Sequence, residues 1–362
     1  MAKTPRSGKK TGKTHRYEEV ARALTREIES GKIPVHGLFH SERDIARRYE
    51  ISPLTVRKIY DILEGQSLIY RLHGKGTFVA PRSRRRRILV VLDLAERFDS
   101  RNYDRVDFFL GAMDACATAS REHEVVAIKE AAFRAELPDL LLRYPNLAGI
   151  LFFRNIDLVV EVQGALKALG VPFLFYGSNQ HLPRLAEIPA RLYDEAKITR
   201  LAMEHLTAAG RRRIGVAFIQ AGASPLRLQR WREFLLARGL PAEDRWIFQA
   251  RHFYGSFHQT LREIPAQTFR ELDALYCTSD SFAVDAVQHL LAIGIRVPEE
   301  VAVVAVNHSP ICLQIHPNLT TVSIPLFEDA QACLAKILAL GAGKPGALHD
   351  ESPVALLERQ SG

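Results

Sequence analysis

Residues 41–63, SERDIARRYEISPLTVRKIYDIL, contain two helix-start signals eleven positions apart. Ser41 is followed three residues later by Asp44, as in a capping box, where side chains satisfy free backbone donors of the first turn. Ser52 is followed by a proline, whose missing N–H costs nothing at the first helical position. Apolar residues recur at helical spacing after each signal, so the stretch predicts two helices joined by a short turn.

The sequence around this stretch completes a small domain. An apolar stripe with helical spacing precedes it and ends at Gly31, which predicts a further helix. Two short β-rich runs, 68–71 and 77–80, follow it and flank a glycine-rich basic turn at 73–76. Three helices and a hairpin are typical of a winged helix-turn-helix domain, which we assign to residues 15–80.

This arrangement predicts DNA binding. An α-helix fits the major groove, where its N-terminal outward residues reach bases and phosphates, and a narrow positive hairpin tip suits a minor groove. The predicted contact residues on the helices and at the hairpin tip are Arg43, Ser52, Thr55, Arg57, Lys58, His73, Gly74 and Lys75. The alternative is a winged helix that contacts a protein partner.

The charge distribution favours DNA. The 362-residue chain has 49 Lys and Arg against 41 Asp and Glu, a net charge of +8. Of these, 21 bases and only 9 acids lie before residue 88, so the first part carries +12 and the remainder −4. A basic excess confined to one part of a chain indicates a polyanionic partner for that part. We expect residues 1–14 to form a disordered basic arm and the arginine-rich residues 81–87 to form a linker.

Beyond Ile88, β-rich runs alternate with amphipathic helical segments. The predicted strands are 88–92, 125–128, 150–153, 172–176, 214–218, 275–278 and 301–306. The predicted helices are 106–118, 158–169, 198–208, 227–237 and 282–293. This alternation predicts an α/β fold with mainly parallel sheets. More than 270 residues are too many for one such sheet, so we assign 88–362 to a two-lobed domain.

Polar residues at the ends of the predicted strands indicate a small-molecule site. Ligands of open α/β sheets bind at the carboxyl ends of the strands. Guanidinium groups donate paired hydrogen bonds to hydroxyls or carboxylates, and carboxylates accept hydrogen bonds from sugar hydroxyls. The candidates at these ends are Asp93, Arg97, Arg154, Tyr176, Ser279, Asp280, Asn307 and His308. The alternative for each is a polar residue in a solvated loop.

Four blocks in fixed order carry a family resemblance: SERDIA (41–46), TVRK (55–58), LIY (68–70) and GKGTFV (74–79). With them, residues 15–80 resemble the DNA-binding domain of the GntR family of bacterial transcription regulators. The resemblance implies DNA roles for Arg43, Arg57 and Gly74. His40 stands where the family usually has proline, and Pro53 stands where an arginine is frequent. The operator sequence is therefore not inherited from the family.

A second resemblance covers about residues 88–340 and rests on AGRRRIG (209–215), SDSFA (279–283), GIRVPEEVAVV (294–304) and PNLTTV (317–322). These segments resemble the LacI/GalR family, whose core is like the periplasmic sugar-binding proteins. The resemblance implies two α/β lobes with an effector clamped between them. It also places an effector-binding arginine at Arg227, before the helix that contains Trp231.

The combined architecture resembles AraR-like arabinose repressors. Where the LacI/GalR family usually has two carboxylates after the last core strand, this chain has Asn307 and His308. With fewer acids at that place, an acidic sugar or sugar phosphate joins the neutral sugars as a candidate effector.

Other function classes have little support. The chain contains no P-loop, zinc-protease or nucleophile-elbow motif, and we expect no catalytic residue, no metal site and no cofactor. The four cysteines are widely spaced in apolar contexts, which predicts buried free thiols. No stretch is apolar enough to span a membrane, so we expect a cytoplasmic protein.

The sequence therefore predicts a ligand-responsive bacterial transcription regulator. We expect a homodimeric repressor that binds double-stranded operator DNA through the winged helix and a sugar, sugar acid or sugar phosphate through the C-terminal domain. Two alternatives stay open: a sugar- or nucleotide-using α/β enzyme, and a small-molecule-binding protein whose basic head contacts a membrane surface or a protein.

Overall fold

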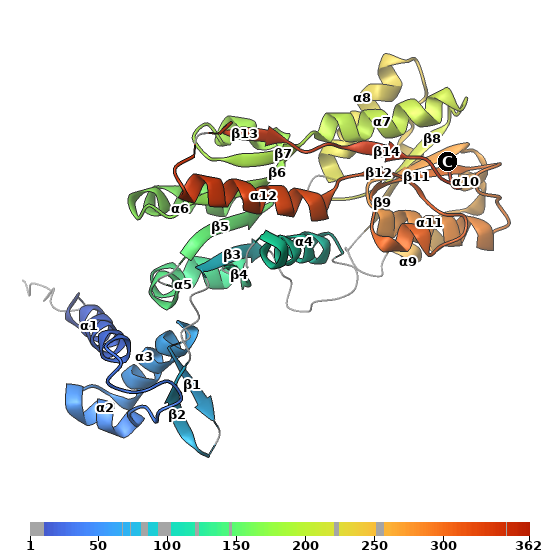
Figure 1. Ribbon diagram of the computed structural model, residues 1–362. Helices are drawn as coiled ribbons and strands as arrows, with labels where there is room; N and C mark the ends of the chain where they lie inside the picture. Colours follow the sequence, from blue (N-terminus) through green and yellow to red (C-terminus); the bar gives the residue numbers. More distant parts are fainter. Residues whose placement is uncertain are drawn as a thin grey trace, which may run out of the picture. The chain divides into compact units, whose positions relative to one another are not determined.

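The structure is a computed structural model (Figure 1). It describes residues 11–66, 68–72, 74–80, 86–92, 103–119, 123–144, 147–220, 224–250, 257–344 and 346–362. The chain divides into two compact units. The first contains Met1–Leu89 and Ser120–Ala148, and the second contains Val90–Ala119 and Gly149–Gly362.

Three helices and a hairpin open the first unit, as predicted. They are α1 (Thr11–Glu29), α2 (Glu42–Tyr49), α3 (Pro53–Gly65), β1 (Ile69–Leu72) and β2 (Gly76–Val79), and the two strands pair antiparallel. One apolar core joins these elements, and its fully buried members include Leu24 of α1, Ile45 of α2 and Val56 of α3. We call residues 11–80 the head.

Helix α1 is longer than the predicted stripe. It begins at Thr11, inside the segment expected to be a disordered arm. Helix propagation is cooperative, so a helix anchored by the buried stripe from Tyr17 onward extends backward through residues that include no proline. Residues 1–10, the rest of the expected arm, lie outside the described residues.

Strand β3 (Arg86–Leu92) begins inside the segment expected to be a linker. Arg87 accounts for this difference. Its Nη1 donates to the Gly65 carbonyl at the end of α3 (2.7 Å), and its Nε donates to Glu124 in β4 (His123–Lys129) at 3.3 Å. The carbonyl end of a helix attracts cations, so this arginine is used within the fold. Residues 81–85 lie outside the described residues.

The rest of the first unit consists of β4 and α5 (Glu130–Arg143), and α5 packs against α3. Residues 120–148 therefore share a compact unit with the head. The contacts of Arg87 and α5 connect these residues to the head.

Two mainly parallel sheets build the α/β part, as predicted. Their strand orders are β13-β7-β6-β5-β3-β4 and β14-β12-β11-β10-β8-β9, and β12–β14 is an antiparallel pair. The first sheet contains β5 (Leu147–Phe153), β6 (Phe173–Ser178), β7 (Ala190–Tyr193) and β13 (His349–Glu351). The second contains β8 (Ile214–Ile219), β9 (Ile247–Ala250), β10 (Ala274–Cys277), β11 (Ala302–Asn307), β12 (Thr320–Ser323) and β14 (Ala355–Leu357).

Helices cover these sheets and define two lobes within the second unit. The first lobe has α4 (Tyr103–Ala119), α6 (Ile156–Ala168) and α12 (Leu326–Gly341). The second lobe has α7 (Glu195–Ala208), α8 (Ser224–Ala237), α9 (Phe257–Glu263), α10 (Ala266–Arg270) and α11 (Asp280–Ala292). All seven predicted strands and all five predicted helices are present, with small shifts at their ends.

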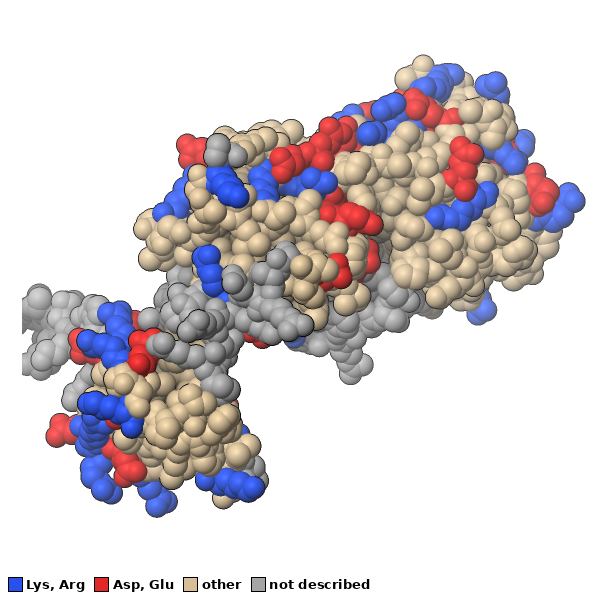
Figure 2. Space-filling model, in the orientation of Figure 1, with Lys and Arg blue, Asp and Glu red and all other residues tan. Residues whose placement is uncertain are grey.

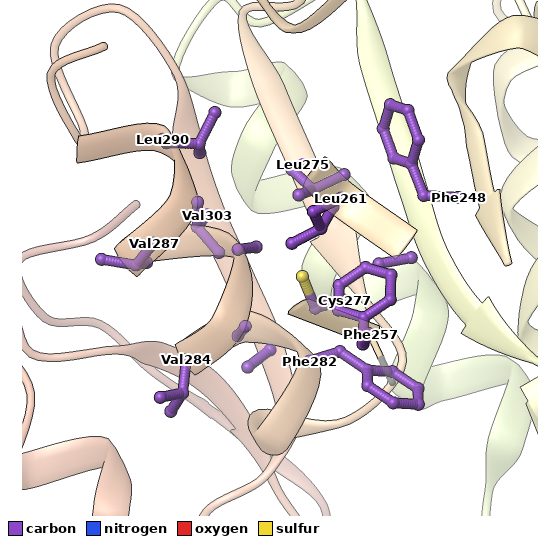
Figure 3. Close-up of a cluster of buried hydrophobic side chains, with 14 of the residues drawn as sticks. Phe248, Phe257, Leu261, Leu275, Cys277, Phe282, Val284, Val287, Leu290 and Val303 are labelled. Atoms are coloured by element: carbon purple, nitrogen blue, oxygen red, sulfur yellow. The ribbon is translucent and has the colours of Figure 1, made fainter. Parts of the chain in front are cut away.

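The core of the second lobe lies between its sheet and the helices α9 and α11. Figure 3 shows Phe257 and Phe282 beside Cys277, and the two phenyl ring centroids are 5.0 Å apart. All four cysteines are free and buried, which confirms the prediction of free thiols. Burial raises the pKa of the Cys312 thiol to about 12.

The described chain passes between the lobes at three places: from β7 to α7, from β12 to α12, and from β13 to β14. The first lobe is therefore completed by α12 and β13, which come late in the sequence. Helix α12 packs so closely on α4 that a Cβ atom at Gly111 would lie 2.2 Å from the Phe327 carbonyl oxygen. Glycine at 111 allows this approach.

Candidate functional sites

The start of α3 presents residues predicted to contact DNA. Ser52 caps the helix, and its Oγ accepts a hydrogen bond from the Thr55 backbone N–H (3.1 Å). The Ser52 and Thr55 hydroxyls are also hydrogen-bonded to each other at 2.8 Å. Leu54 is 77% exposed, and Arg57 and Lys58 are exposed in the following turn. The helix start is thus fixed by its own polar groups, while apolar and cationic side chains face outward.

The two cations of α3 have internal contacts in the head. Arg57 Nε lies 3.4 Å from a carboxylate oxygen of Glu42 in α2, and both side chains are solvent-exposed. Exposed pairs of this kind contribute at most about 1 kcal/mol, so Arg57 can exchange Glu42 for a phosphate. Lys58 Nζ lies 4.2 Å from the centroid of the Tyr17 ring.

Helix α2 begins as the sequence predicted. Ser41 Oγ accepts from the Asp44 backbone N–H (3.2 Å) and donates to the Asp44 carboxylate (2.6 Å). Arg43 is exposed in the first turn and has no ion-pair partner among the described residues. His40 Nε2 lies 2.7 Å from Glu27 Oε1 of α1, so the residue that replaces the family's proline ties α1 to the start of α2.

The hairpin tip is built on two glycines. Gly74 and Gly76 have φ values of +70° and +118°, in the region that favours glycine. Lys75 is exposed between them, and its backbone N–H donates to the Leu72 carbonyl (3.0 Å). His73 lies outside the described residues. Figure 2 shows Lys and Arg side chains along the α2 side of the head and at the end of the hairpin.

In the second unit, Arg154 directly follows β5 and has a left-handed φ of +59°. Its Nη1 donates to Asp104 in the first turn of α4 (2.5 Å). Its guanidinium carbon lies 4.9 Å from the Phe153 ring centroid and 5.4 Å from that of Tyr193. Burial disfavours the charged form, but Tyr193 and Asp104 raise the pKa of Arg154. Its Nε and Nη2 are buried and have no hydrogen-bond partner among the described residues.

Arg227 of α8 forms a bidentate pair with Glu195, the first residue of α7. Its Nε and Nη2 donate to the two carboxylate oxygens at 2.8 and 3.1 Å, and its Nη1 donates to the Thr278 carbonyl at 2.7 Å. The two side chains are 6% and 1% exposed. Burial disfavours the charge, but Glu195 raises the pKa of Arg227. All three guanidinium nitrogens are therefore occupied.

Asp280, the first residue of α11, is also buried. Its carboxylate accepts from the Ser281 and Ser309 backbone N–H groups, both at 2.8 Å. Burial raises the pKa of Asp280, although these hydrogen bonds oppose the shift. Ser279 precedes it, with its hydroxyl 2.9 Å from that of Ser281. These residues follow β10, as predicted.

Asn307 and His308 stand at the end of β11 with φ values of +106° and +80°. Positive φ at two consecutive non-glycine residues is uncommon, and such conformations cluster at functional sites. His308 Nδ1 lies 3.1 Å from Arg359 Nη2. Burial and the neighbouring Arg359 lower the pKa of His308, so its imidazole is neutral at pH 7.

Tyr176 differs from the other candidates because its hydroxyl is bound inside the first lobe. It is fully buried, and its hydroxyl donates to Asp329 of α12 (2.7 Å). Asp329 also accepts from Arg191 Nε of β7 (2.6 Å) and from the Ser352 hydroxyl between β13 and β14 (2.5 Å). One buried carboxylate thus joins residues near all three passages between the lobes. Tyr176 acts within this cluster and does not present its hydroxyl to solvent.

A carboxylate of each lobe acts electrostatically on a candidate residue of the other lobe. Glu195 is among the groups that raise the pKa of Arg154, and Asp104 is among those that raise the pKa of Asp280. The structure therefore brings Arg154, Arg227 and Asp280 together with these two acids. Asp93 and Arg97 lie outside the described residues.

Sequence reasoning missed three carboxylates of this region: Asp104, Glu195 and Asp329. All three stand in the first turn of a helix, where the N-terminal dipole favours acids. Acids in first turns are common, so this signal alone does not distinguish a site from a helix cap. The observation that does so is that each of the three pairs with a buried or partly buried arginine.

Comparison with protein families gives one match in the head and one in the α/β part of the chain. Residues 16–79 match the family described as bacterial regulatory proteins, gntR family, and residues 203–362 match the periplasmic binding protein-like domain. The chain joins a GntR-type head to a periplasmic-binding-protein-like body. The body match begins within α7, so the part of the body before it is recognised by its fold.

Curated relatives of this chain are transcription regulators by name. The HTH-type transcriptional regulator CelR of Thermobifida fusca is 31% identical over 196 residues, 51% of this chain and 56% of the relative. The NTD biosynthesis operon regulator NtdR of Bacillus subtilis is 28% identical over 180 residues, 46% and 52% of the two chains. The chain thus spans about half the length of these relatives.

Solved structures share the fold. A structure described as a transcriptional regulator CelR–cellobiose complex has a TM-score of 0.62 at 21% identity and covers 86% of this chain and 92% of its own. The transcription regulator GntR from Chromobacterium violaceum has a TM-score of 0.62 at 20% identity, with coverage of 76% and 99%. These similarities confirm the two-lobed fold predicted from the sequence.

The described residues contain no group of three or more His, Cys, Asp or Glu side chains arranged to hold a metal ion. None of their helices combines the length and apolar character needed to cross a bilayer.

Proposed function

We propose that the protein is a ligand-responsive transcription regulator, whose head binds operator DNA and whose body binds a sugar-related effector. The observation that carries this proposal is the combination, in one chain, of an exposed recognition-helix start with charged pairs at strand ends of both lobes. The regulator names of the relatives support it, and the cellobiose in the CelR structure supports the sugar class.

In the head, the proposed DNA contacts are the predicted ones. Arg43 and Lys75 are exposed cations of α2 and the hairpin tip, suited to phosphates. Thr55, Arg57 and Lys58 lie on the first turns of α3, which would enter the major groove. Ser52 supports that helix start as its cap, and Gly74 lets the tip approach the backbone.

In the body, the proposed effector contacts come from both lobes. Arg154 belongs to the first lobe, and Ser279, Asp280, Asn307 and His308 belong to the second. The predicted contact Arg227 would bind the effector only by exchanging Glu195 or the Thr278 carbonyl for it. A ligand that touches both lobes favours one lobe arrangement only through unequal affinity for the two arrangements. In a homodimer, this shift would change the spacing of two heads and hence operator affinity.

DNA binding is tested by selecting duplexes from a random pool and footprinting the selected site at 150 mM salt. If about six phosphates are neutralised, the slope of log K against log salt is near −5. The variant Arg43→Gln should reduce that slope by about one, whereas Arg200→Gln, an exposed arginine on α7, should leave it unchanged. Absence of a footprint, or binding that ignores salt, would refute the DNA part.

Effector binding is tested by a thermal-shift screen of sugars, sugar acids and sugar phosphates on the full chain. A ligand at 100 times its Kd adds about 2.7 kcal/mol of stability. The ligand found should also change operator affinity in a gel-shift titration. A ligand that stabilises the body without changing operator affinity would contradict the regulatory link.

A further inference from the structure

Arg227 and Arg154 of the body have the same chemistry but different partners. The Nε–Nη2 edge of Arg227 holds both oxygens of the Glu195 carboxylate. The same edge of Arg154 is buried, yet neither nitrogen has a hydrogen-bond partner among the described residues. Buried N–H groups normally have hydrogen-bond partners, because burying an N–H group without one costs free energy.

The known contacts of Arg154 leave this edge unused. Asp104 accepts a hydrogen bond from Nη1, which is not one of the two nitrogens of this edge. The rings of Phe153 and Tyr193 lie near the guanidinium carbon, and contacts with aromatic faces do not satisfy N–H groups that point within the guanidinium plane. The side chain as a whole is 28% exposed and borders the solvent, although its Nε and Nη2 atoms are themselves buried.

Backbone geometry adds an independent observation. Arg154 has a φ of +59°, which is uncommon for a residue other than glycine. Its backbone N–H donates to the Tyr176 carbonyl (2.7 Å) of the neighbouring strand, which holds it at the end of β5. Strained residues that the surrounding structure holds in place are concentrated at functional sites.

From these observations we propose that the Nε–Nη2 edge of Arg154 binds a carboxylate or phosphate group of the effector, which makes the effector an acidic sugar derivative. This inference rests on the proposed function, since it specifies the ligand of the same site. Two parallel N–H donors match two oxygens on one carbon or phosphorus atom, as the Arg227–Glu195 pair shows inside this protein.

The surrounding acids permit an anion at this place. Glu195 is already paired with Arg227. Burial raises the pKa of Asp280, and burial together with Glu328 and Asp104 raises the pKa of Asp107, so these two carboxyls lose their negative charge more readily. Asp104 is the acid that directly shares Arg154 with the incoming group.

The test measures affinities of the full chain for D-glucuronate, D-galacturonate and inorganic phosphate, with D-glucose and D-galactose as neutral matches at constant ionic strength. A uronate should bind tenfold or more tightly than its neutral match, or phosphate should bind tenfold or more tightly than both neutral sugars. Binding of a uronate indicates the carboxylate form of the group, and binding of phosphate indicates the phosphate form. If no anion binds better than the neutral sugars, the inference is overturned.

Two variants show whether anion binding depends on the Nε–Nη2 edge, on the positive charge alone, or on correct folding. Arg154→Lys keeps the positive charge but removes the two parallel N–H donors, and should weaken anion binding tenfold or more. The matched variant Arg200→Lys at an exposed position should change the anion affinity by less than twofold. Asp104→Asn removes the competing carboxylate and should strengthen anion binding several-fold. A misfolded variant cannot produce such a gain, and its absence would overturn the inference.

The same measurements distinguish failure of this inference from failure of the proposed function. Neutral sugars that bind wild type and Arg154→Lys equally, and still change operator affinity, would leave the regulator proposal intact while refuting the acidic effector. An intact footprint that no small molecule alters would instead refute the ligand response itself.

Discussion

The buried pair Arg227–Glu195 allows a sharp prediction about stability. In Glu195→Gln, the amide oxygen can still accept one hydrogen bond, but its NH2 group faces an arginine N–H donor. The variant therefore loses one charge-assisted hydrogen bond and leaves Arg227, only 6% exposed, without a counter-charge. Breaking a buried pair in this way costs about 3–5 kcal/mol, and we expect that loss in the free energy of unfolding.

The assay is urea unfolding followed by tryptophan fluorescence. Both tryptophans of the chain, Trp231 and Trp246, are buried in the second lobe, so the signal reports the lobe that contains the pair. With an m-value of about 3 kcal/mol/M, the midpoint should fall by roughly 1–1.7 M. Glu233→Gln on α8, the helix of Arg227, breaks an exposed pair with Arg230 and should cost less than about 1 kcal/mol. Equal effects of the two variants would refute the reasoning.

Three further predictions concern other parts of the chain. Gly111→Ala places a Cβ atom 2.2 Å from the Phe327 carbonyl and should lower the free energy of unfolding by about 1–3 kcal/mol, whereas Gly164→Ala, whose Cβ atom meets nothing within 4 Å, should be neutral or stabilising in the same urea assay. Ser52→Ala removes the α3 cap and should cost the head about 0.5–2 kcal/mol, measured by circular dichroism; an unchanged midpoint would contradict the capping role. Because burial raises the pKa of Asp280, its protonated form is favoured in the folded state, so its contribution is complete below about pH 4 and is lost as pH rises through the raised pKa. Wild type should therefore lose stability relative to Asp280→Asn between pH 4 and pH 7, and the opposite trend would show that the sign is wrong.

The head could be predicted closely because its signals are local. The caps at Ser41 and Ser52 act within three residues, and the structure places both as the sequence indicated. The start of β3 could not be predicted from the arginines alone. Arg87 became part of the fold through Gly65 and Glu124, which are distant in sequence.

In the body, most of the apolar strands were predictable and the short polar ones were not. Strand β7 is only four residues long and includes Arg191, whose charge is balanced by Asp329 from a helix far along the chain. Strand β13 reads His-Asp-Glu and has no apolar residue. Because β7 was missed, Glu195 just after it was missed as well. Such charges enter a fold only through tertiary partners, which sequence spacing does not reveal.

The close contact of α4 with α12 has a consequence for synthesis. Gly111 leaves the ribosome roughly 200 residues before Phe327, and at about 5–20 residues per second this interval lasts about 10–40 s. During that time the nascent first lobe lacks the helix that covers α4, whereas the strands β8 to β12 of the second lobe emerge as one continuous segment. The second lobe is therefore able to assemble its sheet first, and the exposed face of α4 is the place where a chaperone would be needed.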